Sequence, residues 1–99
     1  MRPVVAIDLI CAARALLAVP VPARLSTAQT LFFEAEAADW HRRQTGDMHP
    51  HFGDGTLAAA ARRVPMADER SLCDSEMSAA AIMILQMIVQ RNCRNRSTC

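Results

Sequence analysis

The chain has 99 residues, of which 52% are hydrophobic, and a formal net charge of +1. This length fits one domain, and the apolar content excludes a disordered chain. The near-zero charge argues against a dedicated nucleic-acid binder, which would carry a strongly basic stripe. Eighteen alanines and an aromatic content of only 4% predict a core of closely packed helices.

The first expected helix runs from Leu9 to about Val19. Asp8 is well placed as its N-cap, where a carboxylate accepts backbone N–H groups of the first turn. Pro20 ends the helix, because proline disfavours helix in the residue before it. The residues expected on one apolar face are Ile10, Ala13, Leu16 and Leu17.

The second helix is expected to begin near Pro22 or Ser26 and to continue to about Arg43. Its main apolar arc contains Leu25, Ala28, Leu31, Phe32, Ala35 and Ala38. A second stripe, expected to contact the loop that follows, contains Phe33, Ala37 and Trp40. Asp39 falls within the main arc, where a carboxylate needs a partner. Arg42, Arg43 or a loop histidine can supply that partner.

A ten-residue connection, 45–54, holds the turn-forming residues Gly46, Pro50 and Gly53. A short helix from about Thr56 to Val64 is expected to follow it. Either Asp54 or Thr56 is suited to cap this helix, because both side chains accept hydrogen bonds from free backbone donors.

The last helix is expected to begin at Ser71 or Asp74 and to end around Asn92. One face carries Cys73, Met77, Ala80, Ala81, Ile84, Met87 and Ile88. The other face is also apolar, which is typical of a central or interface helix. The sequence thus predicts an all-α domain over 1–92: a small bundle of three main helices and one short helix, with the C-terminal helix central. Residues 93–99 are expected to form a disordered basic tail.

No membrane association or export is expected. The apolar run 77–89 is about 13 residues long, whereas a membrane-spanning helix needs about 20. Asp8 and Arg14 interrupt the N-terminal apolar run, unlike the core of a signal peptide. A cytoplasmic protein with reduced cysteines is therefore expected. The sequence leaves open whether Cys11 and Cys73 form a disulfide.

All three histidines lie in one stretch, 40–57. Within it, residues 45–57 read Thr-Gly-x-x-His-Pro-x-aromatic-Gly-Asp-Gly-Thr-Leu, and alanines follow. This run, together with the segment from Glu34 to Arg43, resembles a family of small uncharacterised bacterial all-helical proteins. The resemblance covers about residues 2–90 and implies no activity, since no function is assigned to that family. His51 and Phe52 depart from the family pattern, which has a basic residue and Trp there, so His51 is the weakest member of any site.

The candidate binding residues in and beside this loop are Trp40, Arg43, His49, His51, Phe52 and Asp54. The favoured interpretation is structural, because polar loop networks more often fix a structure than perform chemistry. A metal site would use His49 and His51 with His41, Asp47 or Asp54, but the usual ligand spacing is missing. An anion pocket at the start of the short helix is the third interpretation, and Asp54 opposes it with its negative charge. We therefore expect no metal, no cofactor and no catalytic residue.

The last helix offers a candidate interface formed by Ile82, Met83 and Val89. Exposed apolar faces of this kind mark association, and a symmetric homodimer is its commonest form. The alternative is that another helix of the domain covers this face. We expect a small non-enzymatic accessory or regulatory protein that binds an unidentified protein or itself. The alternative function is ligand or metal binding by the His/Asp-rich loop 41–56.

Overall fold

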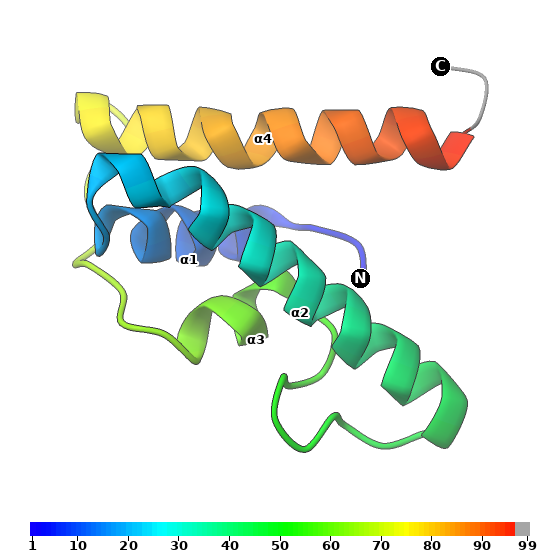
Figure 1. The fold of residues 1–99 in the computed structure, drawn as a ribbon. Coiled ribbons are helices and arrows are strands. Elements are labelled where there is room, and N and C mark those ends of the chain that lie inside the picture. The colour runs from blue at the N-terminus through cyan, green and yellow to red at the C-terminus, as the bar shows by residue number, and fades with distance from the viewer. Residues whose placement is uncertain (97–99) are drawn as a thin grey trace.

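The computed structural model describes residues 1–96 and confirms the all-α prediction. Figure 1 shows the helices α1 (Ala6–Leu17), α2 (Arg24–Thr45), α3 (Leu57–Arg62) and α4 (Ser75–Arg96). A 3-10 turn, η1 (Val21–Ala23), lies between α1 and α2. No strand forms within residues 1–96. A single isolated bridge joins His49 to Gly53 in the loop between α2 and α3.

α1 contacts α2, α3 and α4, and its packing against α3 and α4 is the most extensive in the fold. Its alanines Ala12, Ala13 and Ala15 are completely buried, and their small side chains let the neighbouring helices approach closely. The sequence places the C-terminal helix at the centre instead. α4 does pack extensively along α1, but among residues 1–96 no element lies on its far side (Figure 1). The core is thus built around α1, with α4 as an outer layer.

The predicted N-cap role of Asp8 is wrong, because α1 begins at Ala6 and Asp8 is its third residue. The Asp8 carboxylate accepts one hydrogen bond from the Val5 N–H and another from the Ala58 N–H, both at 2.9 Å. Asp8 is 3% exposed. Its buried carboxylate therefore joins the start of α1 to the first turn of α3, where helix N–H groups lack intrahelical partners.

The other helix ends differ from the predicted ones by a few residues. α4 begins at Ser75, next to the predicted Asp74, but ends at Arg96 rather than Asn92. The predicted tail 93–99 thus overlaps this helix, and its residues 97–99 lie outside the described residues. Cys73 precedes α4 and is exposed, so it does not belong to the buried face.

The state of the cysteines and the apolar character of the helices complete the description of the fold. Cys11 is buried in α1, and Cys11 and Cys73 are both free thiols, so the structure holds no disulfide between them. Among the described helices, none combines the length and the apolar character needed to cross a membrane.

Candidate functional site

The Gly-Asp-Gly-Thr run, 53–56, builds the entry to α3. The Thr56 side chain caps the helix by accepting the Ala59 N–H at 3.1 Å. Asp54 in turn accepts the Thr56 hydroxyl at 2.7 Å and its N–H at 3.0 Å. These hydrogen bonds, led by the one from the hydroxyl, hold the pKa of Asp54 below its ordinary value. Thr56 is thus one of the two predicted caps, and Asp54 supports it.

Gly55 brings the loop directly against α2. Its φ of +93° lies in the left-handed region, and a Cβ at this position would stand 2.8 Å from both Cα and Cβ of Asp39. Its carbonyl accepts the Arg2 N–H at 2.9 Å. Only glycine permits this backbone and this approach without strain, so the motif fixes the loop between α2 and the N-terminal segment.

His49 organises the tip of the loop. Its Nδ1 accepts the N–H groups of His51 and Phe52 at 3.0 and 3.1 Å. Its ring stacks on the Phe52 ring with centroids 4.5 Å apart, and Arg63 lies over the Phe52 ring at 5.0 Å. Partial burial and the charges of His41, His51 and Arg63 lower the pKa of His49. The neutral imidazole is therefore the form that holds this turn.

The remaining predicted loop residues do not join His49. Trp40 is 61% exposed and Phe33 is 68% exposed, so the predicted contact of their stripe with the loop is wrong. Arg43 is turned towards Asp39 at 3.5 Å rather than towards the loop histidines. Of the six candidate loop residues, the structure brings together His49, His51 and Phe52, while Asp54 lies at the entry to α3.

The three histidine rings are close neighbours, with His49 5.0 Å from His41 and 5.9 Å from His51 between ring centroids. Within residues 1–96, however, no three histidine, cysteine, aspartate or glutamate side chains are arranged to hold a metal ion. Nδ1 of His49 already accepts two hydrogen bonds from the loop backbone. The arrangement thus uses this imidazole as a structural acceptor.

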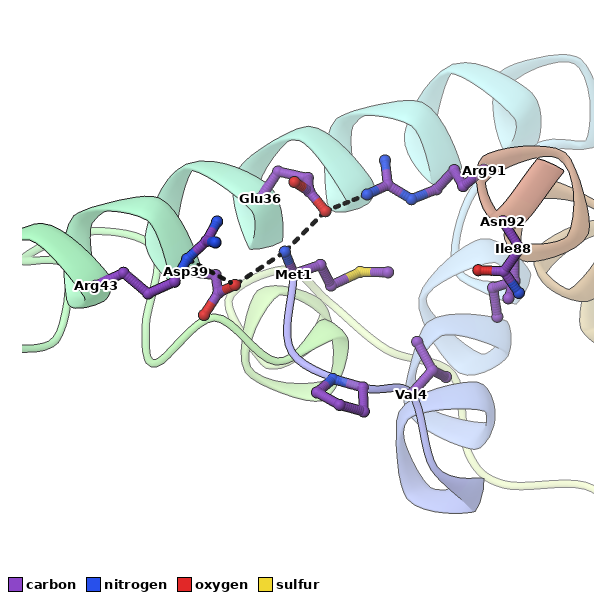
Figure 2. A pocket seen from close by; sticks show the side chains of 9 residues that line it. Met1, Val4, Glu36, Asp39, Arg43, Ile88, Arg91 and Asn92 are labelled. Atoms are coloured by element: carbon purple, nitrogen blue, oxygen red, sulfur yellow. Dashed lines mark hydrogen bonds and ion pairs between the residues drawn. The ribbon is translucent and has the colours of Figure 1, made fainter. Parts of the chain in front are cut away.

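A charged pocket of about 500 Å³ opens beside the N-terminal segment (Figure 2). The Met1 ammonium lies between Glu36, at 2.7 Å, and Asp39, at 3.2 Å. Arg91 of α4 also pairs with Glu36, and Arg43 with Asp39. Its apolar wall includes Pro3, Val4 and Ile88. The pocket therefore joins the N-terminal segment to α2 and α4 through ion pairs.

Asp39 is the buried member of this cluster, with its side chain 8% exposed. Besides the Met1 ammonium it contacts Arg42 at 2.8 Å and Arg43 at 3.5 Å, as the sequence predicts. Burial raises the pKa of Asp39. The hydrogen bond from Arg42, the ammonium group and the charge of Arg43 together lower this pKa by more than burial raises it. The net pKa lies below the ordinary value, so the carboxylate is charged in the folded protein at neutral pH.

The outer face of α4 carries several exposed apolar side chains. Ile82 and Val89 are 52% and 61% exposed, and Leu85 between them is 46% exposed. Met83, in contrast, packs against the core. The exposed stripe of α4 therefore consists of Ile82, Leu85 and Val89, with Gln86 and Gln90 beside them.

Three shallow hollows make this surface continuous around α4. The hollow between α2 and α4 is bordered by the charged pair Glu36 and Arg91, and its other lining residues are Leu25, Gln29, Phe32, Phe33, Met87 and Gln90. The hollow on α4 itself is lined by Ile82, Leu85, Gln86, Val89 and Gln90. The hollow between α1 and α4 is lined by Val4, Val5, Ala6, Leu9, Leu85 and Ile88. Because neighbouring hollows share Gln90 and Leu85, they form one surface, which we call the α4 face.

Comparison with known proteins identifies the family to which this chain belongs. The family model described as Domain of unknown function (DUF7742) matches residues 2–88. The chain belongs to this family. No curated protein and no solved structure matched the chain. The region shared with the DUF7742 family includes the whole loop and Asp39 and ends within α4. The match therefore covers most of the fold, and the family description assigns no activity.

Two parts of these sites escape prediction from the sequence. The Met1 ammonium is a partner of Asp39 that residue patterns do not reveal, because no helical spacing relates the two. Leu85, Leu25 and Val5 enlarge the α4 face, although Leu25 fits the pattern of a buried arc. The sequence feature that could have revealed their exposure is the number of apolar residues on α1, α2 and α4, which is larger than a bundle of this size can bury.

Proposed function

We propose that this DUF7742 protein is a non-enzymatic interaction protein with an accessory or regulatory role, and that the α4 face is its docking surface. One observation carries the proposal: six large apolar side chains line this continuous surface while remaining about half exposed or more. They are Val5, Leu25, Phe33, Ile82, Leu85 and Val89. A contiguous apolar surface of this kind marks an interaction site, whereas scattered apolar side chains do not.

The polar clusters support a non-enzymatic role because their groups are engaged within the fold. His49 holds the loop turn, Asp54 supports the cap of α3, and Asp39 pairs with Met1, Arg42 and Arg43. We also infer that the 45–57 motif is a structural signature of a family of small bacterial proteins. The free thiols of Cys73 and Cys93 favour the reducing cytoplasm as its compartment.

Site-specific photo-cross-linking tests this function in cells that make the protein. A photoreactive residue at position 85, on the α4 face, is expected to give a discrete cross-linked species. The same residue at position 62, at the end of α3, is the control and should give none. The Ile82→Glu substitution should remove the species formed from position 85. Equal labelling from both positions, or none from either, would refute docking through α4.

A second candidate function, small-ligand binding, finds support in the charged pocket rather than in the loop. The pocket is lined by three cationic groups, Met1, Arg43 and Arg91, and by two carboxylates, so a net positive charge faces its hollow. A small carboxylate or phosphate is the matching ligand class. Millimolar phosphate or acetate should then raise the Tm of the wild type and leave that of Arg43→Gln unchanged. An equal response of both proteins would exclude the pocket.

A further inference from the structure

We propose that the occupant of the α4 face is a second copy of this chain, with the two α4 helices paired antiparallel. This inference rests on the proposed function, because it names the partner of the same surface. Three features of α4 support this pairing: the charge along the helix, the spacing of its apolar residues and the area it offers.

Charge is distributed so that one end of α4 complements the other. The segment 68–76, which leads into α4, carries four acidic residues and one arginine; within the copy, Glu76 pairs with Arg24 and Asp74 with Arg70. The segment 91–96, at the other end, carries three arginines and no acid, and one of them, Arg91, pairs with Glu36 of the same copy. Antiparallel pairing places the acidic end of each copy beside the basic end of the other, and it also aligns the two helix dipoles favourably. Parallel pairing would bring like charges together at both ends.

Between these ends the stripe is uncharged and self-complementary. Ile82 and Val89 are seven residues apart, and Leu85 lies between them, which is the repeat that two packed helices share. A two-fold axis between positions 85 and 86 sets Ile82 of each copy opposite Val89 of the other. Each contact then occurs twice, as a symmetric interface requires. Ser75 and Ser78 continue the stripe with small side chains that allow close approach.

The available area matches what a stable pair needs. A 22-residue helix is about 33 Å long, and a band two helix diameters wide along it covers about 700 Å². The hollows on both sides of α4 supply this width with residues of α1 and α2. Stable interfaces bury roughly 800 Å² on each partner, so the α4 face is close to the required size.

Sedimentation equilibrium of the purified protein tests the self-association. The mass of the wild type is expected to rise to that of a dimer as its concentration is increased to about 100 µM. Ile82→Glu should raise the dimer dissociation constant by about 100-fold or more, because each dimer buries two introduced charges. Met48→Glu is the matched control, since Met48 is 64% exposed but lies in the loop away from α4. Circular dichroism checks folding, and Leu85→Glu replaces Ile82→Glu if that variant unfolds.

Disulfide trapping tests the orientation. In a Cys73→Ser, Cys99→Ser background, Ser78→Cys introduces a thiol that antiparallel pairing sets opposite Cys93 of the second copy. Mild oxidation should therefore link position 78 of one copy to Cys93 of the other. Two Cys93 residues would be about 22 Å apart in this arrangement, beyond disulfide reach. A link only between two Cys93 residues, or no link at all in a dimer, would overturn the antiparallel pairing.

The outcomes also separate this inference from the proposed function. A wild type that stays monomeric at every concentration overturns the second copy as occupant. If position 85 then cross-links to a different protein in cells, docking through the α4 face survives and only the self-association fails. If position 85 gives no specific cross-link either, both proposals fail.

Discussion

Replacing Asp39 by asparagine removes the charge of the buried carboxylate but keeps its shape. The native side chain contacts the Met1 ammonium at 3.2 Å, Arg42 at 2.8 Å and Arg43 at 3.5 Å. Breaking a buried ion pair costs about 3–5 kcal/mol, and a hydrogen bond to a charged group is worth about 1.5–3 kcal/mol. The arginine side chains are 35% and 59% exposed, and Glu36 still pairs with Met1 in the variant. The loss of stability should therefore fall in the range for a hydrogen bond to a charged group, about 1.5–3 kcal/mol.

We therefore expect Asp39→Asn to lower the free energy of unfolding by about 2 kcal/mol, which corresponds to a Tm decrease of about 8–16 °C in a domain of this size. Thermal unfolding followed by circular dichroism measures this change. Asp47→Asn is the control, because it removes a carboxylate of the same type from an exposed loop position.

The effect should also depend on pH in a defined direction. The folded-state pKa of Asp39 is lower than its unfolded value of about 3.9, so the stabilisation is complete above that value. It is lost as the pH falls towards the lowered pKa in the fold. The Tm difference between the wild type and Asp39→Asn should therefore shrink below about pH 4. A difference that is negligible at pH 7, or that grows on acidification, would refute the buried ion-pair assignment.

Three further outcomes are expected. Gly55→Ala should destabilise the protein more than Gly46→Ala in thermal unfolding. Both glycines have a positive φ, which costs an alanine about 1–2 kcal/mol at either position, but only the Cβ at position 55 would meet Asp39. Thr56→Ala should lower the free energy of unfolding in urea by about 1 kcal/mol through loss of the α3 cap, and Thr56→Ser should restore it. Because its pKa is lowered, His49 stabilises the loop fully above about pH 6.5 and loses this effect on acidification, so its NMR titration should have a midpoint below that value.

The sequence predicts most of the helices because their apolar spacing and their stop signals act locally. Pro20 separates the first two helices, and Gly46 ends α2 with φ +79°, in the region that glycine adopts readily. The start of α1 is predicted three residues late because Asp8 has two compatible roles. As an N-cap it would serve only its own helix, whereas in the structure it also accepts the Ala58 N–H. That second partner is 50 residues away, so no local pattern reveals it.

The candidate site follows the same division. The partners of Asp39 on its own helix, Arg42 and Arg43, are predictable because residues three and four apart share a helix face. The Met1 ammonium is not, because its position depends on how the N-terminal segment crosses α2. The stripe of Phe33 and Trp40 fails for a related reason: helical spacing shows which residues share a face, but it does not show whether another element covers that face.

The exposure of α4 follows from the size of the domain and the central place of α1. A chain of about 100 residues buries only some 60–70% of its unfolded surface, so four helices cannot all be covered on every side. α1 packs against three neighbours, and its buried alanines allow these contacts. α4 is left with one side on the core and one side open, yet the open side carries Ile82, Leu85 and Val89 rather than charged residues. These apolar side chains do not stabilise the monomer while they are exposed to water. A second copy packed on the open side of α4 would bury them and so stabilise the pair.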